Sequence, residues 1–528
     1  MQNLSTILET SAREYPDRDA FVYEAFRLTY SQVNAMASQV AGALVAQGIK
    51  PGDKVALSCP NLPFFPICYY GILKAGATVV PLNVLLTKRE VTYHLDNSES
   101  KLVIAFQGSE ELPIAQIVHS AVQESQHCKD MWVLTPPGAP SPIEGVPTVM
   151  EQMMQHAPIF DTVQMDNNAT AVILYTSGTT GNPKGAELTH TNLLFNCMVS
   201  RDLMLSKIEP SPKGYETLLI VLPLFHSFGQ SAQMNVGVLA GCTMVLLPRF
   251  ETEKVLELLV KEEITMFAGV PTMYWELLRG AEGGTDVSHI RDNLKVCCSG
   301  GAAMPVELLK NFEAKFDVPI LEGYGLSETS PVATFNRTDR PRKVGSIGLA
   351  VWGVQVRVVD DELNDMPPGE PGEIVIRGHN IMKGYFNNPT ANEECFRGGW
   401  FHTGDVGTVD EEGYFYIVDR TKDMIIRGGF NVYPREIEEV LVSHPEISLA
   451  CVIGIPHDEY GEEIKAFVVL NEGATLAPDA IVKWSKEQLA AYKYPRHVEI
   501  RTELPLGPTG KILKKELRKQ ELGEKAAS

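Results

Sequence analysis

A stretch rich in glycine, serine and threonine, Tyr175–Gly185, contains the residue types that bind phosphate. It follows Thr170–Leu174, a continuous apolar run that predicts a buried strand. Glycine lets the backbone approach a ligand closely, and hydroxyl and N–H groups donate hydrogen bonds to phosphate oxygens. The spacing departs from the P-loop pattern G-x-x-x-x-G-K-[ST], so composition alone leaves an ordinary turn open. The candidate phosphate-binding residues are Thr176, Ser177, Gly178, Thr179, Thr180, Gly181 and Lys184.

Two later loops, Ser299–Ala303 and Glu322–Thr329, each come directly after a run that predicts a strand. In open α/β sheets, ligands bind at the carboxyl ends of the strands. The glycines Gly323 and Gly325 lack the third glycine of a dinucleotide fingerprint. The second loop also contains a carboxylate, Glu328, of the kind that binds magnesium.

Four more segments contain side chains suited to a nucleotide or an acid: Leu222–Gly229 with His226, Trp400–Asp405, Tyr416–Gly429 and Pro505–Lys511. A carboxylate such as Asp405 is a strong acceptor for two sugar hydroxyls. Taken singly, these segments equally fit a packed histidine, a turn aspartate, a charged linker and a solvated lysine.

Composition excludes several classes of protein. With 46 Lys+Arg against 66 Asp+Glu, the net charge of −20 opposes long-range attraction to nucleic acid or anionic lipid. The nine cysteines include no CxxC pair and no zinc-like Cys/His spacing, which indicates thiols in a reducing compartment. Met1–Tyr15 lacks the pattern of a secretory signal, so we expect a cytoplasmic protein. The chain also shows no Ser/His/Asp or Cys/His arrangement of a nucleophilic enzyme.

One long run without charged residues, Thr217–Pro248, could be mistaken for a membrane span. Proline, glycine and polar residues interrupt it, so we predict a buried strand, loop and helix instead. No transmembrane segment is expected, while peripheral contact with a membrane and a homodimer stay open.

Strand and helix patterns alternate through the first several hundred residues, which predicts α/β layers with largely parallel sheets. The expected strands are 54–57, 78–80, 170–174, 264–267, 295–298 and 319–321, and the expected helices include 41–49, 69–74, 273–278 and 305–316.

The pattern changes twice in the last third of the chain. From about residue 345 to 420, alternating runs at 354–359 and 373–377 with Pro and Gly between them predict a β-rich part. We therefore expect a large domain over residues 1–420 and a small α+β domain over 421–528. In the small domain the expected helices are 434–442, 479–489 and 511–520, and the strands are 450–455 and 465–470.

These segments, in this order from Tyr175 to Lys511, resemble the adenylate-forming superfamily of acyl-CoA synthetases, adenylation domains and luciferases. Similarity between the motifs extends over nearly the whole chain and is closest to bacterial long-chain fatty-acid–CoA ligases. The resemblance implies a large N-terminal domain, a small mobile C-terminal domain, and ATP, Mg²⁺ and coenzyme A as cofactors.

The resemblance also implies a role for each matching residue. Lys511, His226, Glu328 and Thr180 would be catalytic, with Glu328 and Thr180 placing Mg²⁺. Gly428 and Gly429 would line the coenzyme A channel, and Lys422 would be the hinge. Arg427, within the Tyr416–Gly429 segment, and Lys493 and Arg496 further along the chain are candidates for the coenzyme A phosphates. ATP and AMP would be bound by the phosphate loop already named and by Gly301, Ala302, Gly323, Tyr324, Gly325, Ser327, Asp405 and Arg420.

The implied reaction joins a carboxylic acid to AMP and then to coenzyme A, with a medium- to long-chain fatty acid as the leading substrate. Gly325 replaces the tryptophan that blocks the tunnel of acetyl-specific relatives, while Gln230 stands where some long-chain members have a gating tryptophan. The alternatives are an aryl or arylpropenoic acid such as cinnamate or ferulate, an enzyme that loads a carrier protein, and a non-catalytic nucleotide-binding protein.

Overall fold

The computed structural model describes residues 2–176, 182–205, 208–281, 287–420, 423–428, 430–457, 460–507 and 510–525. A seven-stranded sheet has the order β18-β8-β7-β4-β3-β5-β6. Its pairs β3–β4, β3–β5, β4–β7 and β5–β6 are parallel, whereas β8 runs antiparallel to β7 and to β18. The strands are β3 Lys54–Ser58, β4 Thr78–Pro81, β5 Ser100–Phe106, β6 Asp130–Leu134, β7 Thr170–Thr176, β8 Lys184–Thr189 and β18 Gly384–Tyr385.

A nine-stranded sheet has the order β15-β14-β13-β12-β11-β9-β10-β1-β2. Its central pairs are parallel and its edges antiparallel, so the predicted α/β layering with largely parallel sheets is confirmed. The strands are β1 Asp19–Tyr23, β2 Phe26–Thr29, β9 Thr217–Ile220, β10 Thr243–Leu246, β11 Met266–Gly269, β12 Val296–Ser299, β13 Ile320–Gly325, β14 Val332–Phe335 and β15 Leu349–Ala350.

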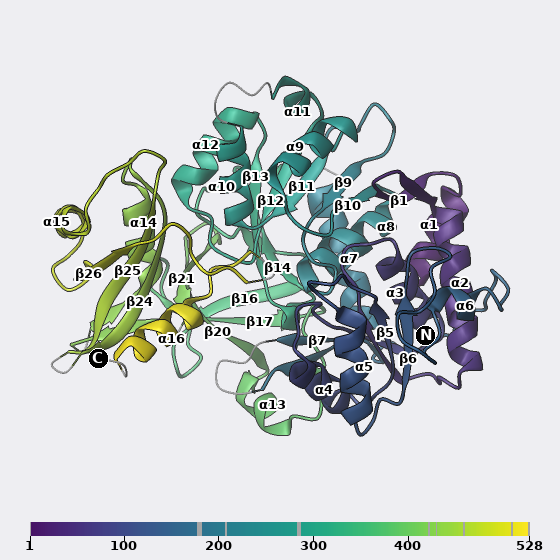
Figure 1. Cartoon of the computed structure of the whole chain (residues 1–528). Coiled ribbons are helices and arrows are strands. Elements are labelled where there is room, and N and C mark those ends of the chain that lie inside the picture. Colours follow the sequence, from purple (N-terminus) through teal and green to yellow (C-terminus); the bar gives the residue numbers. More distant parts are fainter. Residues whose placement is uncertain are drawn as a thin grey trace.

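Helices pack on these two sheets, and α9 to α12 gather beside β11–β13 in Figure 1. Proline opens α10 at its first position, as its fixed φ favours. The helices are α1 Thr6–Glu14, α2 Tyr30–Ala46, α3 Phe64–Lys74, α4 Lys88–Asn97, α5 Ile114–Glu124, α6 Val149–Met153, α7 His190–Met204, α8 Val236–Ala240, α9 Thr252–Lys261, α10 Pro271–Gly280, α11 Ser288–Asn293 and α12 Val306–Phe316.

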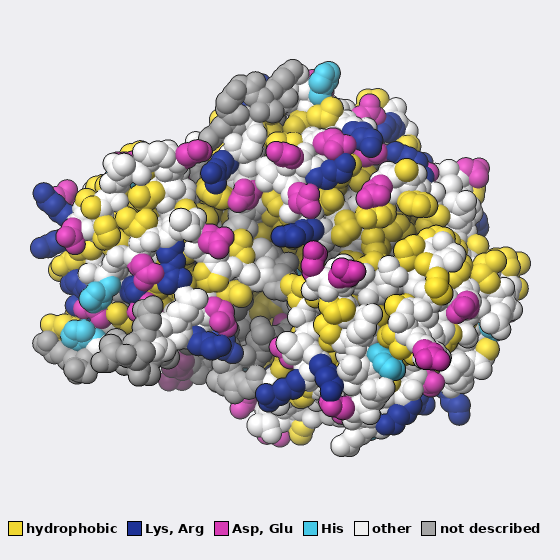
Figure 2. Space-filling view, viewed as in Figure 1, with side chains coloured by type: hydrophobic (Ala, Val, Ile, Leu, Met, Phe, Trp, Pro, Cys, Tyr) yellow, Lys and Arg dark blue, Asp and Glu magenta, His cyan; other side chains and the backbone are white. Residues whose placement is uncertain are grey.

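The charge-free run of the sequence lies inside the protein, as predicted. It forms β9, a π-helical segment η1 over Phe228–Asn235, α8 and β10, and nearly all of its side chains are buried. Among the described residues, no helix is both long enough and apolar enough to cross a membrane. Figure 2 shows acidic and basic side chains interspersed on one face of the molecule.

The predicted β-rich part is confirmed as an antiparallel five-stranded sheet. One insertion of this part leaves the sheet to supply the short β18 to the seven-stranded sheet, and α13 (Pro389–Cys395) follows it. The strands are β16 Val354–Val359, β17 Gly372–Gly378, β19 Phe396–Arg397, β20 Trp400–Val409 and β21 Phe415–Arg420.

The C-terminal residues form a smaller lobe at one side of the molecule, coloured green to yellow in Figure 1. It has its own sheet and its own apolar core. The predicted last helix begins three residues late, at Lys514, so Lys511 lies in a loop. The elements are β22 Ile425–Arg427, β23 Phe430–Val432, α14 Pro434–Val442, β24 Ile447–His457, β25 Gly461–Leu470, α15 Pro478–Gln488, β26 His497–Ile500 and α16 Lys514–Lys525.

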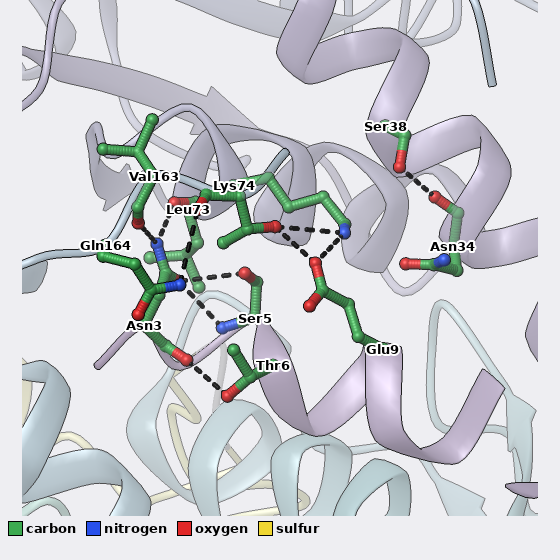
Figure 3. A network of polar contacts seen from close by, with 11 residues as sticks. Asn3, Ser5, Thr6, Glu9, Asn34, Ser38, Leu73, Lys74, Val163 and Gln164 are labelled. Atoms are coloured by element: carbon green, nitrogen blue, oxygen red, sulfur yellow. Dashed lines mark hydrogen bonds and ion pairs between the residues drawn. The ribbon is translucent and has the colours of Figure 1, made fainter. Parts of the chain in front are cut away.

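A buried polar network ties the N-terminal segment to the large body (Figure 3). Lys74, at the end of α3, is only 1% exposed and pairs with Glu9 of α1. Its ammonium also donates to Thr162 Oγ1 at 3.3 Å, so the buried charge is compensated. The Asn3 amide donates to the carbonyls of Leu73 and Val163, at 2.6 and 2.9 Å. These bonds fix α1 against α3.

Candidate active site

A cavity of about 1000 Å³ lies where both large sheets, the β-rich part and the C-terminal loop meet. Because β7, β12 and β13 end at it, the loops after these strands converge there, as the ends of parallel strands do in open α/β sheets. The predicted site residues that line it are Thr176, Lys184, His226, Gly301, Gly323, Tyr324, Gly325, Ser327, Glu328, Asp405 and Lys511.

The remaining predicted residues fall into two groups. Ala302 and Gly428 are described and do not line this cavity; Gly428 lies in the turn between β22 and β23. Outside the described residues lie Ser177, Gly178, Thr179, Thr180, Gly181, Lys422 and Gly429, and the side chain of Arg420 is not described either.

One wall of the cavity joins an aromatic ring to a carboxylate. Tyr324, near the end of β13, donates its hydroxyl to Asp405 Oδ2 on β20 at 2.5 Å. Gly404, just before Asp405, has a φ of +70°, and its N–H donates to Glu373 Oε1 at 3.1 Å. The other oxygen, Glu373 Oε2, lies 2.7 Å from His402 Nδ1. Glu373, on the neighbouring strand β17, therefore fixes the turn that presents Asp405.

A second wall carries the charges suited to phosphate and metal. Thr176 and Lys184 face each other across the β7–β8 pair, on either side of the predicted phosphate loop. Glu328 lies in η2, a single turn of 3₁₀ helix over Ser327–Thr329, and is 7% exposed. Thr176 Oγ1 donates to Glu328 Oε1 at 3.2 Å.

The described residues include no cluster of three or more metal-binding side chains. That fits magnesium, which is usually held by one or two carboxylates together with the phosphates of a substrate. Glu328 is the carboxylate at this wall that could hold the ion, and Lys184 is the cation that could meet phosphate oxygens.

The loop of the C-terminal lobe that carries Lys511 is docked against the large body. The Thr272 hydroxyl, at the start of α10, donates to the Gly510 carbonyl at 2.8 Å. Lys511 extends over Gly301, where a Cβ would lie 3.0 Å from Lys511 Cε. Gly301 also has a φ of +80°, so both the conformation and the lysine favour glycine there.

His226 lies at the same end of the cavity as Lys511. Burial, together with the positive charge of Lys511, lowers the pKa of His226 to about 3. The imidazole is therefore neutral at physiological pH and can act as a hydrogen-bonding group. The Phe228 N–H donates to His226 Nδ1 at 3.3 Å.

The lining of the cavity includes the apolar side chains of Met204, Phe225, Phe228, Val332 and Phe335. Gln230 does not line it. The fully buried Gln230 amide donates to the Leu224 carbonyl at 3.0 Å. The position of the gating tryptophan is thus occupied here by a residue that holds the backbone of the His226 loop.

The backbone gives Gly325 a structural reason of its own. A Cβ at this position would lie 1.9 Å from the Pro331 carbonyl oxygen, so any side chain would collide with that backbone. The close approach of the β13 end to Pro331 therefore requires glycine.

Two of the three candidates for coenzyme A phosphates are already paired. Arg427 makes a two-pronged ion pair with Glu463, with distances of 2.6 and 2.8 Å. Lys493 Nζ lies 2.7 Å from both carboxylate oxygens of Glu436. In this arrangement of the lobe neither cation faces the cavity.

Comparison with known proteins follows the same division of the chain. A family model described as AMP-binding enzyme matches residues 8–386. A second model, described as the C-terminal domain of AMP-binding enzymes, matches residues 436–511. The chain belongs to the AMP-binding enzyme family. The predicted resemblance to adenylate-forming enzymes, based on motifs from Tyr175 to Lys511, is confirmed.

Several AMP-binding enzymes are similar over almost their full length. The long-chain-fatty-acid–CoA ligase of Bacillus subtilis (strain 168) is 37% identical over 540 residues, covering 98% of this chain and 95% of that protein. A feruloyl-CoA synthase of Amycolatopsis sp is 35% identical over 511 residues, covering 96% of this chain and 97% of that protein.

The solved structure of ATP-bound MatB from Rhodopseudomonas palustris superposes with a TM-score of 0.87 at 32% identity, covering 98% of this chain and 99% of MatB. The apo form of MatB superposes with a lower TM-score of 0.78. The arrangement of this AMP-binding enzyme is therefore nearer to the ATP-bound form.

Three residues that line or support the site were missed by the sequence analysis: Thr272, Glu373 and Tyr385. Thr272 and Glu373 act through the backbone groups of Gly510 and Gly404, and no local pattern marks such long-range bonds. Tyr385 had a weak signal, because Gly384 precedes it and the turn residues Asn387, Asn388 and Pro389 follow.

Proposed function

We propose that this chain is an ATP-dependent acyl-CoA ligase that activates a medium- to long-chain fatty acid. The acid forms acyl-AMP with release of pyrophosphate, and the acyl group then passes to coenzyme A with release of AMP. The coarser statement, an adenylate-forming acyl-CoA ligase, follows from the family and its relatives. The observation that carries the proposal is Lys511, which a separate lobe inserts into the cavity that already holds Lys184, Glu328 and Asp405.

The first step requires positioning and charge compensation. The carboxylate of the acid attacks the α-phosphorus in line, and the bond to pyrophosphate breaks. Lys511 offsets the negative charge that develops between the acid and the α-phosphate, and Lys184 binds the outer phosphates. Glu328 would hold a magnesium ion, which would supply further charge neutralisation at the phosphates.

The nucleotide's other end would be held by the wall made of Tyr324 and Asp405. We assign to the Tyr324 ring the stacking on adenine, and to Asp405 the acceptance of the ribose hydroxyls. Arg420 sits opposite Asp405 across the β20–β21 pair, and we assign it a second ribose contact. No protein nucleophile is needed, because AMP itself is the leaving group when the thiol attacks.

Two observations bear on the acid. The lining of the cavity includes several apolar side chains beside His226 and the charged groups, which suits a hydrocarbon tail. A long-chain-fatty-acid–CoA ligase and a feruloyl-CoA synthase are similar to this chain at 37% and 35% identity. The second relative favours an arylpropenoic acid as the alternative substrate.

A panel of acids separates these candidates. Purified enzyme is supplied with ATP, magnesium and saturated acids of increasing chain length, beside cinnamate and ferulate, with and without coenzyme A. We expect AMP release to be highest for a fatty acid and to require coenzyme A for turnover. A preference for ferulate would overturn the fatty-acid proposal. AMP release that ignores the acid would overturn the ligase proposal, and a requirement for a carrier protein would identify a loading enzyme.

A further inference from the structure

Tyr385 lies between the two oppositely charged groups of the phosphate wall. Its hydroxyl donates to Glu328 Oε1 at 2.9 Å. The ammonium of Lys184 lies 5.2 Å from the centroid of the same ring, within cation–π distance. One aromatic side chain thus contacts both the candidate metal ligand and the candidate phosphate ligand.

The two oxygens of the Glu328 carboxylate are not equivalent. Oε1 accepts from both Tyr385 and Thr176, at 2.9 and 3.2 Å. Within the described part of the chain, Oε2 has no hydrogen-bond partner. Because Glu328 lines the cavity, Oε2 is the oxygen left to bind a cation there. Carboxylates that bind metals are commonly oriented by such hydrogen bonds to their other oxygen.

The backbone of Tyr385 is itself fixed from two sides. β18 pairs with β8, so Tyr385 lies opposite Ala186, two residues from Lys184. On the other side, the Asn392 carboxamide of α13 accepts from the Tyr385 N–H at 2.6 Å and donates to its carbonyl at 3.1 Å. A side chain whose backbone is held by both β8 and α13 can orient a charged group at a small cost in conformational freedom.

We propose that Tyr385 is a positioning residue for the metal: it turns Oε2 of Glu328 toward the cation and keeps Lys184 beside it. The inference rests on the proposed function, because it assumes that ATP and magnesium bind at this wall. It adds a residue of the β-rich part to the phosphate site.

The test measures metal binding rather than turnover. Manganese, which reports its free concentration by electron paramagnetic resonance, is titrated into the full chain with α,β-methylene-ATP, an analogue that cannot be cleaved. Tyr385→Phe removes the hydroxyl and keeps the ring; Tyr385→Leu removes both. Tyr416→Phe is the matched control. The Tyr416 hydroxyl also donates to a carboxylate, Asp410 Oδ2, at 3.1 Å, but Tyr416 does not line the cavity.

We expect Tyr385→Phe to weaken manganese binding by about tenfold or more, as the loss of a hydrogen bond to a metal ligand does. Nucleotide binding in excess chelator should stay close to wild type for this variant and weaken for Tyr385→Leu, which also loses the contact to Lys184. Tyr416→Phe should match wild type in both measurements.

Wild-type manganese affinity in Tyr385→Phe would overturn the inference. If that variant does not fold, Thr176→Val replaces it, because it removes the other bond to Oε1 and carries the same expectation. If the wild-type chain shows no nucleotide-dependent binding of manganese, the proposed function fails instead. The two failures are therefore distinguishable.

Discussion

Asp405 reaches its place through hydrogen bonds that begin on another strand. The carboxylate of Glu373 accepts from the Gly404 N–H and lies beside His402, so it fixes the backbone on which Asp405 is presented. A carboxylate that contacts two groups of one turn restricts that turn more than either contact alone. At the scale of single residues, the orientation of Asp405, the proposed ribose contact, depends on a residue of the neighbouring strand.

Glu373→Gln should therefore weaken the binding of ATP, because Asp405 would be less well oriented toward the ribose hydroxyls. A carboxamide is uncharged and has only one acceptor oxygen, so its hold on the turn is weaker. We expect KM for ATP to rise about tenfold, the magnitude of one hydrogen bond to a charged group. With 2′,3′-dideoxy-ATP, which lacks the hydroxyls that Asp405 would bind, variant and wild type should have similar KM values.

The control for this measurement is Glu370→Gln, an exposed carboxylate on the loop before β17. It should leave both KM values unchanged. If Glu373→Gln raised KM equally for both nucleotides, Glu373 would have a general structural role, and the proposed link to the ribose would be contradicted.

At the scale of elements, the packing of β13 and α14 sets the environment of Glu322 and therefore its charge state. This side chain in the middle of β13 is 5% exposed and lies near Arg435 and Glu439 of α14, a helix of the C-terminal lobe. Burial raises the pKa of Glu322 to about 7, although Arg435 acts in the opposite direction. The large body and the lobe therefore meet around a group that titrates near neutral pH.

The sign of the resulting pH dependence follows from proton binding. Between its ordinary pKa of 4.5 and about 7, Glu322 holds more proton in the folded than in the unfolded chain. Its contribution to stability is thus present below that window and is lost as pH rises through it. The loss should reach about 3 kcal/mol, with one pKa unit worth about 1.4 kcal/mol.

Glu322→Gln removes this titration. We expect its melting temperature to match wild type at pH 5 and to exceed it at pH 8, as followed by circular dichroism. Glu411→Gln, at an exposed position, should follow the wild-type profile throughout. Parallel profiles of wild type and Glu322→Gln would show that Glu322 does not titrate in this range.

At the scale of the whole molecule, the C-terminal lobe carries two segments, one around Lys511 and one around Gly428, that we assign to different half-reactions. Lys511 lies in the cavity, whereas Gly428, the described glycine of the expected coenzyme A channel, does not. We propose that the C-terminal lobe turns about Lys422 between the half-reactions. The present arrangement, with Gly510 bound to Thr272, would then serve adenylation.

Lys511→Ala separates the half-reactions. Formation of acyl-AMP from acid and ATP should fall on the order of 10²–10³-fold, the usual effect of removing one group that stabilises charge in a transition state. Thioester formation from synthetic acyl-AMP and coenzyme A should remain near wild type, as measured by release of AMP. Lys515→Ala, on the exposed face of α16, is the control. Equal losses in both half-reactions would rule out the alternation.

Local sequence was sufficient for most elements and for the candidate site as a set of motifs. The parallel strands follow from β-branched runs between helices, and glycine-rich segments mark loops at strand ends. Eleven predicted residues line one cavity because these loops follow strands of neighbouring sheets. The start of the last helix and the reason for Gly325 were not predictable, since each depends on contacts with distant backbone.

By itself, the amino-acid sequence determined which groups are available for chemistry: a glycine- and threonine-rich loop, the carboxylates Glu328 and Asp405, and a lysine near the end of the chain. Tertiary structure decided which of these groups meet and what orients them. Glu373, Tyr385 and Thr272 act on partners 31, 57 and 238 residues away, and separations of that size leave no periodic pattern in a single sequence. Hydrophobic patterning specifies which face of an element is buried, but only packing of the finished sheets brings those faces into register.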